Sequence, residues 1–319
     1  MSYTPTVSVI LPNYCHARYL DQRIQSILDQ SYQDFELIIL DDCSPDGGAS
    51  KAVIEKYRGN EHVSHIIYNE TNSGSTFRQW HKGFDLARGK FIWIAESDDY
   101  CEPTMLETLI NKSAESPSAS LLYVNSLYVD SEGKTIQRYA KFILDRQKAF
   151  ESKEYSSRKF INKFMTIGCG VPNASACIFR KDVIQGMPLD YMDFKAAGDR
   201  LFWIHVAEKG SVVFVTKPMN YFRQHDNKVS PRKMREGITH EEDLKICKYL
   251  NEKGYLNSLQ KHVTWCSYIR SVYMTDFETE EIKNKTLTMW RKECNHGYRY
   301  TAFVCKLKNR LDRMHIEIL

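Results

Sequence analysis

The sequence predicts an α/β protein with a mostly parallel, Rossmann-like β-sheet flanked by helices and a C-terminal helical extension. Three observations carry this prediction. Short apolar runs alternate with amphipathic helical patterns over about the first 130 residues, and from about residue 240 the pattern is helical throughout. The chain has 319 residues, which is enough for one large domain with a small appendage.

The predicted elements alternate regularly through the first part of the chain. Strands are expected at 7–11, 35–40, 63–68, 91–94 and 121–128, and helices at 20–30, 49–57, 77–87 and 104–114. The strand runs are almost continuously apolar, as in a parallel sheet that is covered on both faces. Because ligands of such sheets bind beyond the C-terminal ends of the strands, the residues after each strand are the candidates for chemistry.

The rest of the chain divides into an irregular part and a helical part. Further strands are expected at 174–179 and 212–215 and a helix at 199–208, followed by helices at 241–252, 258–275, 280–293 and 302–314. We therefore predict a first domain over 1–235 and a helical region over 236–319, with the boundary near Pro231.

Composition narrows the class of protein. With 42% hydrophobic and 26% charged residues, 15 Gly and 9 Pro, the chain is neither disordered nor fibrous in type. No apolar run approaches the roughly 20 residues of a membrane span, and the N-terminus lacks a signal-peptide pattern. Nine scattered cysteines without a Cys-x-x-Cys pair favour free thiols in the cytoplasm. The net charge of +4 is too small to indicate a nucleic-acid partner.

Polar and aromatic residues follow three of the predicted strands. The first strand leads into Tyr14, the second into Asp41-Asp42, and the fourth into Asp98-Asp99. Adjacent carboxylates are tolerated where a divalent cation or hydrogen-bond donors compensate their repulsion, and an aromatic ring offers a stacking surface for a base. Either acidic pair alone fits an ordinary turn or helix N-cap, whereas three such strand ends together favour a binding site.

Three segments resemble the N-terminal half of the family 2 glycosyltransferases, which are inverting enzymes with the GT-A fold. They are VSVILPNYCHARYLDQRIQSILDQSYQDFELIILDDCSPDGG at 7–48, NETNSGS at 69–75 and GFDLARGKFIWIAESDDY at 83–100. The resemblance implies metal-dependent transfer of a hexosyl or N-acetylhexosaminyl group from a nucleotide diphosphate. UDP is the expected carrier, with thymine and guanine as the alternative bases. The acceptor would be a hydroxyl of a glycan or polyprenyl-linked molecule, in cell-surface polysaccharide synthesis.

The resemblance also implies roles for residues at the strand ends. Tyr14 would stack on the nucleotide base, Asp42 would hydrogen-bond the edge of the base, and Pro12 would lie beside them, where relatives often have a small hydroxyl residue. Asp98 would lie near the ribose, and Asp99 would bind Mn²⁺ or Mg²⁺ on the diphosphate.

Other implied roles lie further along the chain. Arg78 is the expected cation facing the diphosphate, although the spacing around it departs from the family pattern, and Lys82 or no residue are the alternatives. Asp199 would be the catalytic base; a helix N-cap is the competing interpretation. His225 lies in a segment, 221–230, that closes over the diphosphate in many members, and a surface-loop histidine is its alternative. Asn173 and Ser175 are candidates for the acceptor pocket.

The last helices carry an excess of positive charge. Residues 282–319 contain nine Lys or Arg against three Asp or Glu, with aromatic residues between them. Peripheral contact with an anionic membrane, at the inner face of the plasma membrane, is one interpretation, and a solvated helix face is the other.

Three other functions are alternatives to the transferase. A non-catalytic nucleotide-sugar sensor or scaffold on the same fold would keep Tyr14 and Asp42 without needing Asp199. A sugar nucleotidylyltransferase would need a Gly-rich basic loop after the first strand, and a dinucleotide dehydrogenase would need Gly-x-Gly-x-x-Gly there. Residues 12–16 contain no glycine, which argues against the last two.

Overall fold

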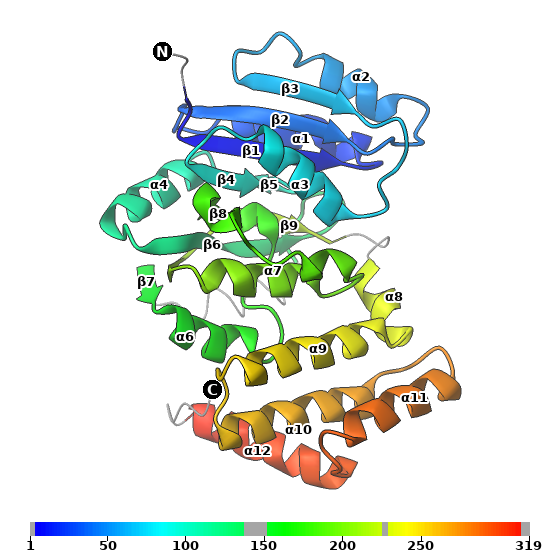
Figure 1. Cartoon of the computed structure of the whole chain (residues 1–319). Coiled ribbons are helices and arrows are strands. Elements are labelled where there is room, and N and C mark those ends of the chain that lie inside the picture. The colour runs from blue at the N-terminus through cyan, green and yellow to red at the C-terminus, as the bar shows by residue number, and fades with distance from the viewer. Residues whose placement is uncertain (1–3, 137–151, 225–228, 314–319) are drawn as a thin grey trace. The chain divides into compact units, whose positions relative to one another are not determined.

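The computed structural model describes residues 4–136, 152–224 and 229–313, and the chain divides into two compact units (Figure 1). The first unit comprises Met1–Ser156, Val171–Met187 and Val206–Asp226. The second comprises Ser157–Gly170, Pro188–His205 and Asn227–Leu319. Both units are therefore discontinuous in sequence. The predicted division at residue 235 is simpler, and it stays a prediction.

The first unit is built on one nine-stranded sheet. Its strands are β1 (Val7–Asn13), β2 (Phe35–Asp41), β3 (Val63–Tyr68), β4 (Phe91–Ile94), β5 (Tyr100–Cys101), β6 (Ala119–Val129), β7 (Ser152–Tyr155), β8 (Cys177–Arg180) and β9 (Ser211–Arg223). The hydrogen-bonded order is β3-β2-β1-β4-β8-β6-β9-β5, and β7 also pairs with β9.

The sheet contains parallel and antiparallel pairs, and its longest ladders are parallel, as expected. β1 to β4 form a parallel block, and β6 pairs in parallel with β9, but β8 runs antiparallel to both β4 and β6. The short strands β5 and β7 are antiparallel to β9 and were not expected from the sequence. The α/β class with flanking helices is confirmed, while strand direction depends on contacts between distant segments that periodicity does not report.

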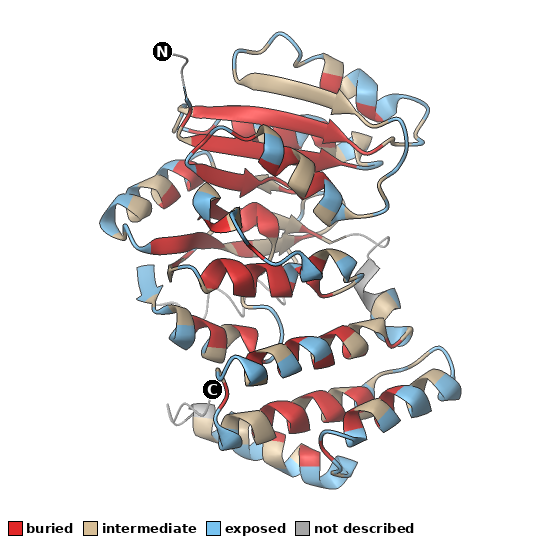
Figure 2. Ribbon diagram, viewed as in Figure 1, coloured by how far each residue is buried: buried red, intermediate tan, exposed pale blue. Residues whose placement is uncertain are grey.

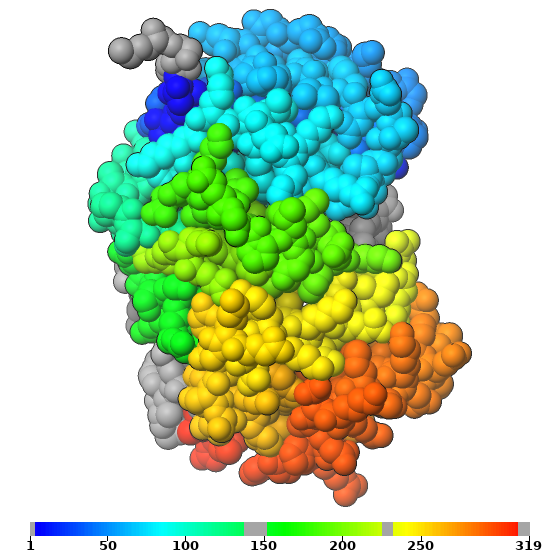
Figure 3. Space-filling view, viewed as in Figure 1, coloured from blue at the N-terminus to red at the C-terminus, as the bar shows by residue number. Residues whose placement is uncertain are grey.

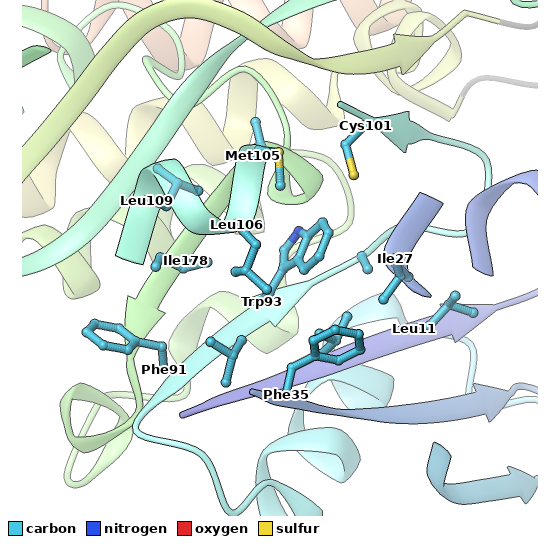
Figure 4. Packing of buried hydrophobic residues seen from close by; sticks show 14 of the residues in the cluster. Leu11, Ile27, Phe35, Phe91, Trp93, Cys101, Met105, Leu106, Leu109 and Ile178 are labelled. Atoms are coloured by element: carbon cyan, nitrogen blue, oxygen red, sulfur yellow. The ribbon is translucent and has the colours of Figure 1, made fainter. Parts of the chain in front are cut away.

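Helices cover both faces of the parallel block (Figure 1). They are α1 (Ala17–Leu28), α2 (Ala49–Glu55), α3 (Thr76–Leu86) and α4 (Met105–Glu115). Leu20, Ile24 and Ile27 recur at helical spacing on α1 and are fully buried, together with Val9 and Leu11 of β1. Figure 4 shows part of this core, with Trp93 of β4 among aliphatic side chains.

On the opposite face of the sheet, α3 packs closely against β1. A Cβ atom at Gly83 of α3 would lie 2.4 Å from Cγ2 of Ile10, so only glycine fits at this crossing. Ile10 points away from Val9 and Leu11 because side chains alternate along a strand. The first turns of α3, which carry Arg78 and Gln79, are thereby held at the end of β1.

The second unit is helical in the part of the chain that the structure describes. Its helices are α6 (Ser157–Phe160), the first part of α7 (Gly198–Ala207), α8 (Val229–Arg235), α9 (Ile238–Glu252), α10 (Ser258–Met274), α11 (Glu280–Arg291) and α12 (Tyr298–Arg313). Asn257 and Gln260 form a capping box that begins α10. Tyr268 stacks on Trp290 in the core, where their rings lie 5.2 Å apart. Buried helix faces appear red in Figure 2. Among the described helices, none is long and apolar enough to cross a bilayer.

A buried histidine predicts acid sensitivity of the second unit. His240 is 1% exposed, and burial lowers its pKa to about 4. Between pH 6.5 and pH 4 this histidine is protonated in the unfolded chain, where its pKa is near 6.5, but stays neutral in the folded chain. The folded state therefore loses stability as the pH drops through this range. We expect the free energy of unfolding to fall by about 2 kcal/mol between pH 7.5 and pH 5 on this account. Urea unfolding of His240→Gln should lack this part of the pH dependence; an unchanged pH dependence would contradict the assignment.

Candidate functional site

The ends of β1, β2 and β4 meet at one edge of the sheet. Asn13 at the end of β1 donates from Nδ2 to Oδ1 of Asp41 at the end of β2, at 2.6 Å. Nδ1 of His16, which follows β1, lies 2.8 Å from Oγ of Ser97, which follows β4. The expected convergence of the three strand ends is therefore present in the first unit.

Two of the residues assigned to the nucleotide base lie on β1 and just after it. Tyr14 is 46% exposed, so its ring is available for stacking. Cys15 and Cys43 both adopt positive φ, 58° and 57°, in the turns that leave β1 and β2. Pro12 is buried within β1, so its side chain is not open to solvent.

Asp42 is buried and its carboxylate is already hydrogen-bonded. Oδ1 accepts from Asn69 Nδ2, Ser73 N and Gln79 Nε2 at 2.6, 2.8 and 2.9 Å. Oδ2 accepts from Ser73 Oγ at 2.7 Å. Asp42 thus ties the 69–75 loop and α3 to the end of β2, and any contact with a base must share oxygens that already accept these bonds.

Arg78 is exposed in the first turn of α3. Its Nη1 donates to the Ser73 carbonyl at 3.1 Å. The guanidinium therefore contacts the 69–75 loop, which is also hydrogen-bonded to Asp42. Lys82, the alternative cation, donates its Nζ to Asn69 Oδ1. Both cations therefore belong to the same loop and helix, and Arg78 is the one that remains exposed.

The turn after β4 concentrates three carboxylates within four residues. Asp99 is fully buried: its Oδ2 accepts from Asn173 Nδ2, and its Oδ1 accepts from the Arg223 backbone N–H at 2.9 Å. Glu96 accepts from Trp80 Nε1 at 3.1 Å and is partly exposed, as is Asp98. Several donors thus hold the turn in one conformation.

The charges of this turn are only partly compensated. Burial, with the charge of Asp98 second, raises the pKa of Asp99 to about 7. Burial, followed by the charges of Asp98 and Asp99, raises the pKa of Glu96 to about 8. A cation or a cationic ligand group near the turn would stabilise the ionised forms of these acids.

Arg223, at the end of β9, is the main support of the acidic turn. Its Nε donates to the Asp98 carbonyl at 2.7 Å, and its guanidinium lies 4.4 Å from the ring centre of Tyr19. Its Nη2 donates to Gln22 Oε1 at 2.7 Å. At 2% exposure Arg223 is a structural cation of the turn rather than one open to solvent.

The carboxylates fit a hard divalent cation in their chemistry. Mg²⁺ and Mn²⁺ prefer oxygen ligands and use few protein carboxylates when phosphate oxygens and water complete the shell. No group of three or more His, Cys, Asp or Glu side chains within the described ranges forms a metal site by itself. Asp98 and Asp99 could supply only part of such a cation's ligands, and a diphosphate would have to complete the shell.

Asp199 belongs to the second unit and lies in the first turn of α7. It is exposed, and its Oδ1 accepts from the Arg200 N–H at 2.8 Å. Because α7 begins at Gly198, Asp199 is inside the helix rather than at the N-cap position. The surrounding protein lowers the hydration of the carboxylate although the residue reaches solvent, and this raises the pKa of Asp199, which suits a group that must take up a proton.

Two neighbouring acids of α9 hold the segment around Asp199. Glu242 is buried and accepts from three consecutive backbone N–H groups, those of Lys195, Ala196 and Ala197, at 2.6, 2.9 and 2.7 Å. Asp243 pairs with the buried Arg200 guanidinium at 2.7 Å. The backbone before Asp199 and the side chain after it are thus both fixed within the second unit.

The sequence left several supporting residues without a role. Gln79, Glu96 and Glu242 carried no recognisable motif. Asn173 was expected at an acceptor pocket, but it bonds Asp99; Ser175 is fully buried and its Oγ accepts from the Glu96 N–H at 3.1 Å. A polar residue just before an apolar strand is only a weak sequence signal that its side chain supports the acidic turn.

His225, expected to help close the donor site, lies outside the described residues.

Comparisons with known proteins bear on the same region. The family model described as glycosyl transferase family 2 matches residues 8–186, more than half of the chain. The poly(ribitol-phosphate) beta-N-acetylglucosaminyltransferase TarP of Staphylococcus aureus is 28% identical over 201 residues, covering 62% of this chain and 56% of TarP. The GalNAc(5)-diNAcBac-PP-undecaprenol beta-1,3-glucosyltransferase of Campylobacter jejuni is 25% identical over 163 residues, 51% of each chain. The chain spans about half the length of these curated relatives.

Solved structures show the same fold. The structure of S. aureus TarS in complex with UDP-GlcNAc matches with a TM-score of 0.55 and 20% identity, covering 96% of this chain and 77% of that one. This likeness confirms the GT-A fold expected from the sequence. Together with the family model, it confirms the resemblance on which the site residues were first assigned: the chain belongs to glycosyl transferase family 2.

Proposed function

We propose that this protein is an inverting, metal-dependent glycosyltransferase that moves a sugar from a UDP-sugar to a hydroxyl of a glycan or lipid-linked acceptor. The observation that carries the proposal is the acidic turn of Glu96, Asp98 and Asp99, which the contact of Ser97 with His16 joins to the turn that carries the exposed Tyr14. Membership of the family and the UDP-GlcNAc complex of TarS support a nucleotide-sugar donor.

The donor would be bound by residues of the first unit. Tyr14 would stack on the base, and Asp42 would fix the loop beside it while accepting from the base edge. Asp98 would bind the ribose, and Arg78 would neutralise part of the diphosphate charge. Asp99 would hold Mn²⁺ or Mg²⁺, which when bound stabilises the negative charge of the leaving diphosphate.

The hydroxyl group that receives the sugar must lose its proton, and Asp199 would take up this proton. As the acceptor oxygen attacks C1 of the sugar, a new C–O bond forms, the C1–O bond to the diphosphate breaks, and C1 is inverted. The hydroxyl proton passes to the Asp199 carboxylate. Glu242 and Asp243 would keep Asp199 in place. His225 would contribute to closing the donor site.

The names of two relatives support the kind of acceptor that we propose. TarP acts on poly(ribitol-phosphate) and the C. jejuni enzyme on an undecaprenol-linked glycan, by their names. We propose an acceptor of this general kind, in cell-surface polysaccharide synthesis. The protein would work in the cytoplasm, with residues 282–319 in peripheral contact with the inner face of the plasma membrane.

A panel of nucleotide sugars, with and without Mn²⁺, tests the donor and the metal together. Ligands that bind the folded state raise the melting temperature. UDP-sugars are expected to stabilise the protein only with metal, and Asp99→Asn should lose the metal-dependent part. Tyr14→Ala should weaken the response to every donor, because base stacking is worth about 1–3 kcal/mol. Equal stabilisation in a chelator would contradict the metal assignment.

The sensor alternative is decided by turnover. An enzyme releases free UDP from the donor at a rate that rises with added acceptor. A binding protein would show the thermal shift without this release, and that result would replace the transferase proposal with the sensor.

A further inference from the structure

The last helix presents an exposed face on which apolar and basic side chains lie in two adjacent lines. On the inner side of α12, Thr301 and Cys305 are buried, and Sγ of Cys305 lies 3.8 Å from Oγ of Ser267 on α10. These two residues are four apart, so they mark the face that packs on α10. The opposite face of α12 is what remains open.

The first line on the open face is apolar. Phe303 and Leu307 are 62% and 46% exposed, and Tyr300, 44% exposed, lies at the edge of this face, where its hydroxyl contacts Nε2 of His262 on α10 at 3.1 Å. Their spacing of three and four residues puts them on one side of the helix, about half a turn away from the buried pair. Large apolar side chains gathered on one exposed face indicate an interaction surface.

The second line is basic. Arg299, Lys306 and Arg310 are exposed and spaced by seven and four residues, so they lie along the helix next to the apolar line. None of the three forms an ion pair with another part of the chain that the structure describes. The last helices, orange to red in Figure 3, contribute atoms to the surface of the second unit.

We propose that this face of α12, defined by Arg299, Tyr300, Phe303, Lys306, Leu307 and Arg310, docks on an anionic lipid bilayer. An apolar line enters the boundary between headgroups and acyl chains, and the cations beside it meet the lipid phosphates. A second copy of the chain is a poorer occupant, because a two-fold contact would bring the basic lines of both copies together. Only the biological role of this docking rests on the proposed function, since membrane contact would bring the protein to a lipid-linked acceptor.

Vesicle flotation with the full chain tests the proposal. The protein is expected to float with vesicles of 30% phosphatidylglycerol in phosphatidylcholine, to float far less with pure phosphatidylcholine, and to be released by 0.5 M NaCl. R299Q/K306Q/R310Q should lower partitioning at least tenfold, because each basic residue near an anionic surface contributes about fivefold. F303S/L307S should lower it even at low salt.

A matched control removes the same charge elsewhere. Lys134, Lys209 and Lys217 are exposed residues of the first unit, so K134Q/K209Q/K217Q changes the net charge equally and should float like the wild type. If both triple variants lose binding equally, net charge and not α12 is responsible, and the proposal fails. It also fails if the wild type does not float, or if light scattering shows instead that Phe303 and Leu307 mediate self-association.

Flotation needs no turnover and no donor. A protein that floats as expected but transfers no sugar would leave the docking surface standing and remove the proposed function. A protein that transfers sugar but floats with neither anionic nor neutral vesicles would leave the proposed function standing and remove the docking surface.

Discussion

Replacing Asp199 by asparagine is expected to lower kcat by about 10²–10⁴-fold while leaving the Kd of the donor unchanged. Asparagine has nearly the same shape, and its Oδ1 can still accept from the Arg200 N–H, so α7 should begin as before. What the amide lacks is the ability to take the acceptor proton. Acceptor-dependent UDP release gives kcat, and calorimetric titration with a UDP-sugar gives the Kd.

Asp193→Asn is a suitable control for this experiment. Asp193 is also an exposed acid of the same unit, six residues earlier, so its replacement removes equal charge from the same region. It should retain wild-type kcat. An Asp199→Asn enzyme with full turnover would remove Asp199 from the mechanism, and a variant that lost donor affinity as strongly as kcat would make it a binding residue.

Replacing Glu242 by glutamine is expected to destabilise the protein by about 2–3 kcal/mol. Three backbone N–H groups point at the two oxygens of the buried carboxylate. Glutamine keeps one oxygen and turns an NH₂ group towards N–H donors, so at least one buried donor loses its partner. Urea unfolding measures the loss. Because the same N–H groups precede Asp199, we expect kcat to fall by about tenfold or more with KM for the donor little changed.

Glu241→Gln is the matched control for Glu242. Glu241 is the preceding residue of α9, and its side chain is 39% exposed in an ion pair with Lys285. Surface pairs of this kind contribute about 0–1 kcal/mol, so this variant should be nearly neutral in both assays. Equal effects at 241 and 242 would show that helix α9, and not the contact with residues 195–197, is responsible. A stable but fully active Glu242→Gln enzyme would contradict the positioning role.

Local sequence pattern predicted the strand ends well. The runs before Tyr14, Asp42 and Asp98 are apolar because both faces of β1, β2 and β4 are buried, and an apolar run that stops at polar residues marks the end of its strand. Since parallel strands end at one edge of a sheet, the gathering of these residues followed from the pattern alone. The C-terminal helices were also predicted, with their ends shifted by a few residues.

Long-range support could not be predicted in this way. Asn173 and the Arg223 N–H reach Asp99 from 74 and 124 residues away, and Glu242 reaches Ala197 from 45 residues away. Each donor or acceptor is an ordinary polar residue in its own segment. The antiparallel direction of β8 could not be predicted either, because the alternation of side chains along a short strand is the same in both directions.

The position of β9 limits where this chain can be divided. The family match ends at residue 186, yet β9 begins at Ser211, pairs with β5, β6 and β7, and brings Arg223 to the acidic turn. A fragment that stopped at 186 would leave β6 paired only with β8, exposing its other edge, and would remove Arg223 from Asp98 and Asp99. Recombination between family members should therefore exchange Asp99 and Arg223 together, with breakpoints outside 99–223 rather than at residue 186, where the family match ends.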